Sequence, residues 1–231
     1  MYDRDWYREE YSRRESQKRS NRRNVPSNSG KITLIIMLFA LIFFIVRSVS
    51  NLYVDFPVTI GLIAVNIVMF ALIKTGKLYY ESMFSSYEMT ILHKGYYRVA
   101  SSAFTHEEPL HIIVNMGSLY NLGVVLEPVL GSNKYLFLYI VIMIVEGFIS
   151  AYLHKLKNPY ARSIGASGVI CGLLGVYIVL AIRVAGISGI KSVVPTILLM
   201  CLMTASKRID SIAHFVGLAV GIVCAVIMVS I

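Results

Sequence analysis

Hydrophobic side chains fill seven segments of the chain, and polar residues gather in the first 31 positions and between the segments. The runs Ile32–Val46 and Phe56–Ile73, for example, contain almost no charged residue. A helix needs about 20 mainly apolar residues to cross a bilayer. The pattern therefore predicts an all-α polytopic membrane protein, with hydrophobic segments near residues 32–47, 56–74, 110–126, 135–153, 167–183, 191–205 and 211–230.

Composition supports this class. Hydrophobic residues make up 56% of the chain and charged residues 15%, whereas soluble domains average about 25% charged residues. The formal net charge of +9 is divided between a tail, where nine Lys/Arg outnumber five Asp/Glu in residues 1–31, and many short loops. Basic residues that flank membrane segments explain this charge, so we expect a lipid bilayer as partner and no nucleic acid.

Three regions follow from the pattern. Residues 1–31 are too polar to fold alone and are expected to form a disordered basic tail. Residues 32–47 form an extra hydrophobic segment, short for a membrane span. Residues 56–230 hold the main domain, in which the long connection 75–109 is rich in Tyr, Ser and His and is expected to be ordered and functional.

Loop charges bear on orientation, because Lys and Arg favour the cytoplasmic side. Alternate loops on one side hold nine such residues: Lys74, Lys77, Lys94, Arg98, Lys155, Lys157, Arg162, Lys207 and Arg208. The other set holds Arg47, Lys134, Arg183 and Lys191. If residues 32–47 span the membrane, the basic tail lies on the same side as these nine basic residues. The charge distribution therefore predicts that this side is cytoplasmic.

Ser167 lies in Gly165-Ala166-Ser167-Gly168, and a serine between glycines is either a nucleophile that a substrate backbone can approach or a small residue for close helix packing. His214 lies in an otherwise apolar segment and offers the base that a nucleophilic serine needs. Gly217 and Gly221 on the same segment favour close approach of another helix.

His111 and Asn115 lie four residues apart, hence on one helix face, where their side chains can donate to an oxyanion. Ser167, His214 and His111 each lie about 5–8 Å below the last charge of their loops. Those three loops are alternate ones, so all these residues share one membrane face. This agreement favours a catalytic site over three separate packing roles.

No carboxylate obviously completes a triad. Asp210 lies one turn before His214 and is expected to cap the last helix, which leaves a Ser167–His214 dyad. Glu127 and Glu146 are further ionisable residues in membrane segments, where such residues are costly and usually functional. The role of Glu146 is not explained by this pattern. The three cysteines, Cys171, Cys201 and Cys224, suggest no metal or disulfide framework.

Over residues 57–228 the sequence resembles the rhomboid family of intramembrane serine proteases. Four features carry the resemblance in the family's order: Tyr97-Arg98, where the family usually has Trp-Arg; His106, His111 and Asn115; Gly165-Ala166-Ser167-Gly168; and Ala213-His214 with Gly217 and Gly221. Glu127 and Gly131 also match the family pattern. The resemblance implies a six-helix core, here preceded by one extra hydrophobic segment.

It further implies that Ser167 is the nucleophile, that His214 is its general base, and that His111, Asn115 and the Ser167 amide stabilise the oxyanion. The remaining motif residues, His106, Arg98, Glu127, Gly165, Gly168, Gly217 and Gly221, would be structural. Substrates would be transmembrane segments of other proteins, cleaved without cofactor or metal. The protein itself would be a multi-pass protein of a bacterial plasma membrane. The fifth core helix, near 191–205, would gate substrate access.

Two features depart from the family. Cys171 replaces the aromatic residue on which the family's histidine commonly stacks, so we expect low turnover and expect Cys171→Tyr to preserve or raise it. The extra segment 32–47, if it spans, turns the site toward the cytoplasm; the alternatives are that it does not span or that the tail is exported. Competing functions are a silent rhomboid relative that binds membrane clients and, with less support, a small transporter.

Overall fold

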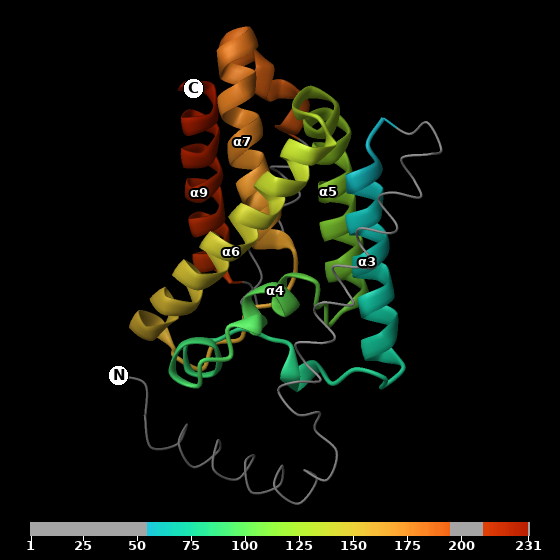
Figure 1. Cartoon of the computed structure of the whole chain (residues 1–231), viewed down its shortest axis with the longest axis vertical. Coiled ribbons are helices and arrows are strands. Elements are labelled where there is room, and N and C mark those ends of the chain that lie inside the picture. The colour runs from blue at the N-terminus through green and yellow to red at the C-terminus, as the bar shows by residue number, and fades with distance from the viewer. Residues whose placement is uncertain (1–54, 195–209, 231) are drawn as a thin grey trace, which may run out of the picture.

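The computed structural model describes residues 55–194 and 210–230, and these form a bundle of helices (Figure 1). The tail, the segment 32–47 and most of the segment 191–205 lie outside the described residues. The elements are α3 (Pro57–Lys74), η2 (Tyr80–Ser82), η3 (Tyr87–Leu92), α4 (Tyr97–Ala103), α5 (Pro109–Leu130), α6 (Ser132–Lys157), α7 (Ser167–Ala185), η4 (Gly186–Val193) and α9 (Ser211–Ser230).

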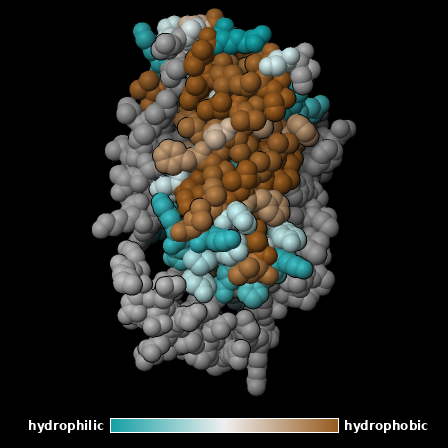
Figure 2. Space-filling model, turned by 90° about the vertical axis from the view of Figure 1, so that its left-hand side faces the viewer, coloured by the Kyte–Doolittle hydropathy of each residue, from teal (hydrophilic) through white to brown (hydrophobic). Residues whose placement is uncertain are grey.

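Five of these helices, α3, α5, α6, α7 and α9, are long and apolar enough to cross a membrane. Figure 2 shows a broad hydrophobic band on one face of the molecule, with hydrophilic residues at both ends of the band. Exposed apolar side chains such as Phe137 and Val184 face outward, as lipid-facing residues do. The prediction of an all-α polytopic membrane protein is confirmed.

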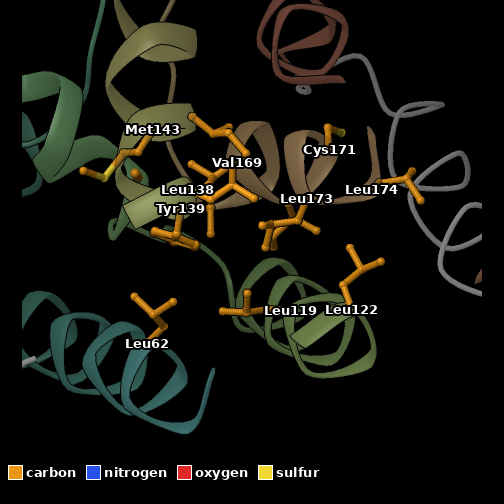
Figure 3. Close-up of a cluster of buried hydrophobic side chains, with 14 of the residues drawn as sticks. Leu62, Leu119, Leu122, Leu138, Tyr139, Met143, Val169, Cys171, Leu173 and Leu174 are labelled. Carbon is orange, nitrogen blue, oxygen red and sulfur yellow. The ribbon is translucent and has the colours of Figure 1, made fainter. Parts of the chain in front are cut away.

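The core lies where α3, α5, α6 and α7 meet. Figure 3 shows Leu62 of α3, Leu119 of α5, Tyr139 of α6 and Leu173 of α7 pointing toward one another. All four side chains are almost fully buried. Their close packing fixes the four helices against each other, and α9 joins them through its contact with α7.

Helix α5 continues past the predicted end of its segment because the buried carboxylate of Glu127 is fully hydrogen-bonded. It accepts bonds from the backbone N–H groups of Val58 and Thr59, both at 2.8 Å, and from the hydroxyls of Thr59 and Ser132, both at 2.7 Å. A carboxylate at a helix N-terminus satisfies N–H groups that have no partner within the helix. Glu127 thereby joins the beginning of α3 to the end of α5, at the end of the bundle away from the cavity described below.

The connection 75–109 folds against the other end of the bundle, as expected for an ordered segment. It contains η2, η3 and α4, and α4 packs against α6 (Figure 1). Arg98 of α4 is buried and donates from Nη1 to the carbonyl oxygens of Phe84, at 2.7 Å, and Glu81, at 3.2 Å. Its guanidinium also lies 5.2 Å from the centre of the Phe84 ring. The buried Arg98 side chain thus fixes α4 to the part of the connection that contains Glu81 and Phe84.

Candidate active site

One cavity of about 150 Å³ lies at the end of the bundle where α5, α7 and α9 begin. His111 and Asn115 of α5, Ser167 of α7 and His214 of α9 all line it. Glu107 and Glu108, both exposed, also line the cavity, so it reaches the water-facing loops. The structure thus brings together the four residues that the sequence places on one face of the membrane.

Ser167 is the first residue of α7, a position set by the loop before it. The Gly165 N–H donates to the Ser102 carbonyl of α4 at 2.9 Å, and Ser163 pairs with Ser85 through two backbone hydrogen bonds of 2.8 and 3.0 Å. The first N–H groups of a helix have no acceptor within that helix. The N–H of Ser167 therefore belongs to the part of α7 that can bind a negatively charged oxygen.

Gly165 is required for two reasons at once. Its φ angle is +96°, a backbone conformation in which L side chains are strained. A Cβ on Gly165 would also lie 2.8 Å from His111 Cε1 and Nε2 and 3.1 Å from Asn115 Nδ2. The backbone just before Ser167 therefore touches the two side chains predicted to stabilise an oxyanion.

His106 holds the side chain of Asn115 in place through a hydrogen bond. It is fully buried, and its Nε2 lies 2.8 Å from Asn115 Nδ2, which donates to it in this arrangement. Burial, together with the neighbouring His111, lowers the pKa of His106 to about 3, so the ring is neutral and its Nε2 can accept. An amide nitrogen has two hydrogens, and the second stays available to the cavity.

His214 enters the cavity from the first turns of α9. Its side chain is 8% exposed, and neither ring nitrogen has a hydrogen-bond partner among the described residues. Asp210 directly precedes α9: its Oδ1 accepts from the Ala213 N–H at 3.1 Å, and its carbonyl oxygen accepts from the His214 N–H at 3.3 Å. The side chain of Asp210 thus caps α9, as a cap residue does.

Glycines set the distance between the helices that carry Ser167 and His214. Gly217 of α9 packs against the carbonyl oxygen of Gly168, and Gly221 packs against that of Gly172 one turn further on. A Cβ at Gly175 would likewise lie 2.5 Å from the Leu218 carbonyl oxygen. Small residues at such crossings let two helix backbones touch.

Glu146, unexplained by the sequence pattern, lines the same cavity. It is 7% exposed, and its Oε1 accepts from the Ser150 hydroxyl at 2.8 Å. A Cβ on Gly168 would lie 2.7 Å from its carboxyl group, so this acid packs directly beside the residue after Ser167.

The sequence analysis missed His154, which is almost fully buried and lies 2.9 Å from Asp210 through its Nε2. A signal was present, because Glu146, Ser150 and His154 recur every fourth residue and so share one face of α6. Polar residues at helical spacing inside a membrane segment indicate a polar partner. In the structure Glu146 faces the cavity, and His154 contacts Asp210 just before α9.

Parts of the chain are similar in sequence to known proteins. The family model of the rhomboid domain matches residues 93–231, more than half of the chain. Rhomboid protein 1, mitochondrial, of Saccharomyces cerevisiae is 33% identical over 81 residues, which are 34% of this chain and 23% of that protein. Rhomboid-like protease 3 of Toxoplasma gondii is 29% identical over 96 residues, 42% of this chain and 32% of that protein.

The matched stretches cover less than a third of the length of either curated relative. The family match contains His106, His111, Asn115, Ser167 and His214. It removes the alternative of an unrelated small transporter. On the family match and the helical membrane fold together, this chain belongs to the rhomboid family.

Proposed function

We propose that the chain is an intramembrane serine protease that cleaves membrane proteins in or near their transmembrane segments. One observation carries the proposal: Ser167, His214, His111 and Asn115, from three helices far apart in sequence, line one cavity. Family membership supports the same activity, and the Toxoplasma gondii relative bears the name of a protease.

In the first step, the Ser167 hydroxyl oxygen attacks the carbonyl carbon of the scissile peptide bond. His214 takes the hydroxyl proton as general base, the new C–O bond forms, and the carbonyl electron pair moves onto the oxygen. Because His214 Nδ1 and Nε2 have no partner among the described residues, either nitrogen is free for the hydroxyl proton. Asp210 is bound to His154 and Ala213, which favours a dyad over a triad.

The tetrahedral oxyanion would then be bound by the Ser167 N–H and by the side chains of His111 and Asn115. The His111 and Asn115 side chains lie against Gly165, whose missing side chain leaves the room for them, and the Ser167 N–H follows two residues later. Donors fixed before the reaction stabilise the charge that develops in the transition state, and each contributes about 10²–10³-fold in kcat. His106 would act as a positioning residue, since its bond to Asn115 holds the amide in place.

The protonated His214 next donates its proton to the leaving amine, and the C–N bond breaks to give an ester on Ser167. Water attacks this ester with His214 again as base, which releases the carboxylate product and restores the serine. The exposed Glu107 and Glu108 at the cavity rim give this water a route from the loops. The reaction as written consumes one water molecule and needs no cofactor.

The substrates we propose are transmembrane segments that unwind near small residues, with the bilayer as the medium of the reaction. The site lies at the bundle end that carries Lys74, Lys94, Lys155 and Arg162, so we propose that it faces the cytoplasm. The proposal of a bacterial plasma membrane rests on the resemblance alone, since the named relatives come from a yeast mitochondrion and a parasite.

A fluorophosphonate probe tests the nucleophile directly, because it phosphonylates an activated serine and releases fluoride. The purified chain in detergent should be labelled, and peptide mapping should find the label on Ser167. Ser167→Ala should abolish labelling, whereas Ser188→Ala, at an exposed serine of η4, should not. A folded protein that takes no label would instead favour a silent relative that binds membrane clients.

A further inference from the structure

A buried histidine and aspartate join α6 to the beginning of α9. His154 lies near the end of α6, and its Nε2 is 2.9 Å from Asp210 Oδ1. The side chains are 3% and 13% exposed. A hydrogen bond to a carboxylate is stronger than one between neutral groups, and it is stronger still away from water.

The same carboxylate contacts two further parts of the site. Its Oδ1 also accepts from the Ala213 N–H, which places it at the N-terminus of the helix that carries His214. The Ser163 side chain lies beside it, in the loop that leads to Ser167. Burial alone would raise the pKa of Asp210, but His154, Ser163 and the Ala213 N–H together hold that pKa below its ordinary value.

We infer that His154 and Asp210 form a positioning pair, which fixes the beginning of α9 against α6 and thereby sets where His214 stands relative to Ser167. This inference rests on the proposed function. It assigns to His154 a role in the reaction although the side chain does not line the cavity.

The geometry distinguishes this role from that of a third catalytic residue. A triad aspartate would bind the ring of the base, yet neither nitrogen of His214 has a partner among the described residues. The Asp210 oxygen that is bonded goes to His154 and to the helix N–H instead. Asp210 therefore acts on His214 through the position of the helix.

A shift of this helix start, whose residues Asp210 and Ala213 line the cavity together with His214, would move His214 relative to the Ser167 hydroxyl. A misplacement of about 1 Å can cost about 100-fold in rate. The glycine contacts of α7 and α9 lie further along α9, at Gly217 and Gly221, so they do not hold its first turn. We therefore expect loss of the pair to lower kcat while leaving KM, which reflects substrate binding, almost unchanged.

Two variants of His154 separate the hydrogen bond from the volume of the side chain. His154→Gln keeps an N–H donor, and His154→Leu fills similar space without one. With a single-span fluorogenic substrate in detergent, we expect His154→Leu to lower kcat by about 10-fold to 100-fold at constant KM. His154→Gln should retain kcat within about threefold of wild type, and thermal melts should show both variants folded.

The inference is overturned if folded His154→Leu retains the kcat of wild type, or if His154→Gln loses as much as His154→Leu. If the leucine variant does not fold, His154→Met, which also lacks a donor, replaces it in the comparison. Wild type and Ser167→Ala are measured alongside. A wild type that does not cleave refutes the proposed function, and the inference with it, whereas cleavage by wild type with no effect of either substitution refutes the pair alone.

Discussion

Gly217 of α9 packs directly against the carbonyl oxygen of Gly168 in α7. Gly168 follows Ser167, and Gly217 lies one turn after His214, so this contact brings the helices that carry the two residues to backbone contact. The distance between the proposed nucleophile and its base thus depends on the absence of a side chain at Gly217.

Gly217→Ala should therefore separate α7 from α9 and lower both stability and cleavage. Overpacking of this kind costs about 1–3 kcal/mol, which thermal melts in detergent would report. Gly117→Ala is the matched control, because a Cβ at Gly117 of α5 meets nothing within 4 Å. Equal effects of the two substitutions would contradict the role of the contact.

Gly165→Ala should abolish most cleavage, because the new methyl group would displace His111 and Asn115. The positive φ angle adds strain of about 1–3 kcal/mol. Gly76→Ala separates the two effects, since Gly76 has a φ angle of +72° and nothing within 4 Å of its Cβ. We expect both variants to lose stability but only Gly165→Ala to lose activity, as measured by initial cleavage rates on folded protein.

Asn115→Ala removes one proposed oxyanion donor and should lower kcat by about 10²–10³-fold. The substrate's ground state needs this donor less than the transition state does, so KM should change little. Steady-state kinetics of the variant in detergent provide the measurement. An unchanged kcat would exclude Asn115 from the reaction.

Asp210→Asn should lower stability at neutral pH by about 1–2 kcal/mol, because it removes a charge that is bonded to His154 and to the Ala213 N–H. The folded-state pKa of Asp210 lies below the ordinary value of 3.8. Its charge therefore stabilises the fold above that value, and the contribution is lost as pH falls through the folded-state pKa. Melting temperatures of wild type and variant should converge in acid and differ most at neutral pH; a constant gap would contradict this.

The amide of that variant still offers an oxygen to cap α9 and to accept from His154. Folded Asp210→Asn should therefore keep most of its cleavage activity. Complete loss of activity in the folded variant would show that Asp210 is a third catalytic residue, and the dyad would be wrong.

The hydrophobic pattern predicted the five described spans well, but it missed how some of them end. The segment predicted to stop at 126 continues to Leu130, because Glu127 is not a polar helix end but a buried acceptor for Val58 and Thr59. Val58 and Thr59 lie 69 and 68 residues before Glu127 in the sequence, so a local pattern cannot reveal these hydrogen bonds.

The sequence predicted only part of the candidate site, because contacts between residues distant in sequence cannot be seen in a local pattern. Residues with chemistry of their own, such as Ser167 and His214, stand out against an apolar background. His154 does not, because a histidine beside Lys155 at a helix end resembles an ordinary interfacial residue. Its importance depends on Asp210, which approaches only when α9 folds against α6.

The most direct test of the account is cleavage of a single-span substrate by the purified chain in liposomes. Wild type would be compared with Ser167→Ala and His214→Ala, and with His93→Ala as a control at a histidine whose side chain is 65% exposed. We predict cleavage by wild type and by His93→Ala, and none by the other two folded variants. Cleavage that survives Ser167→Ala or His214→Ala would contradict the proposed Ser167–His214 dyad.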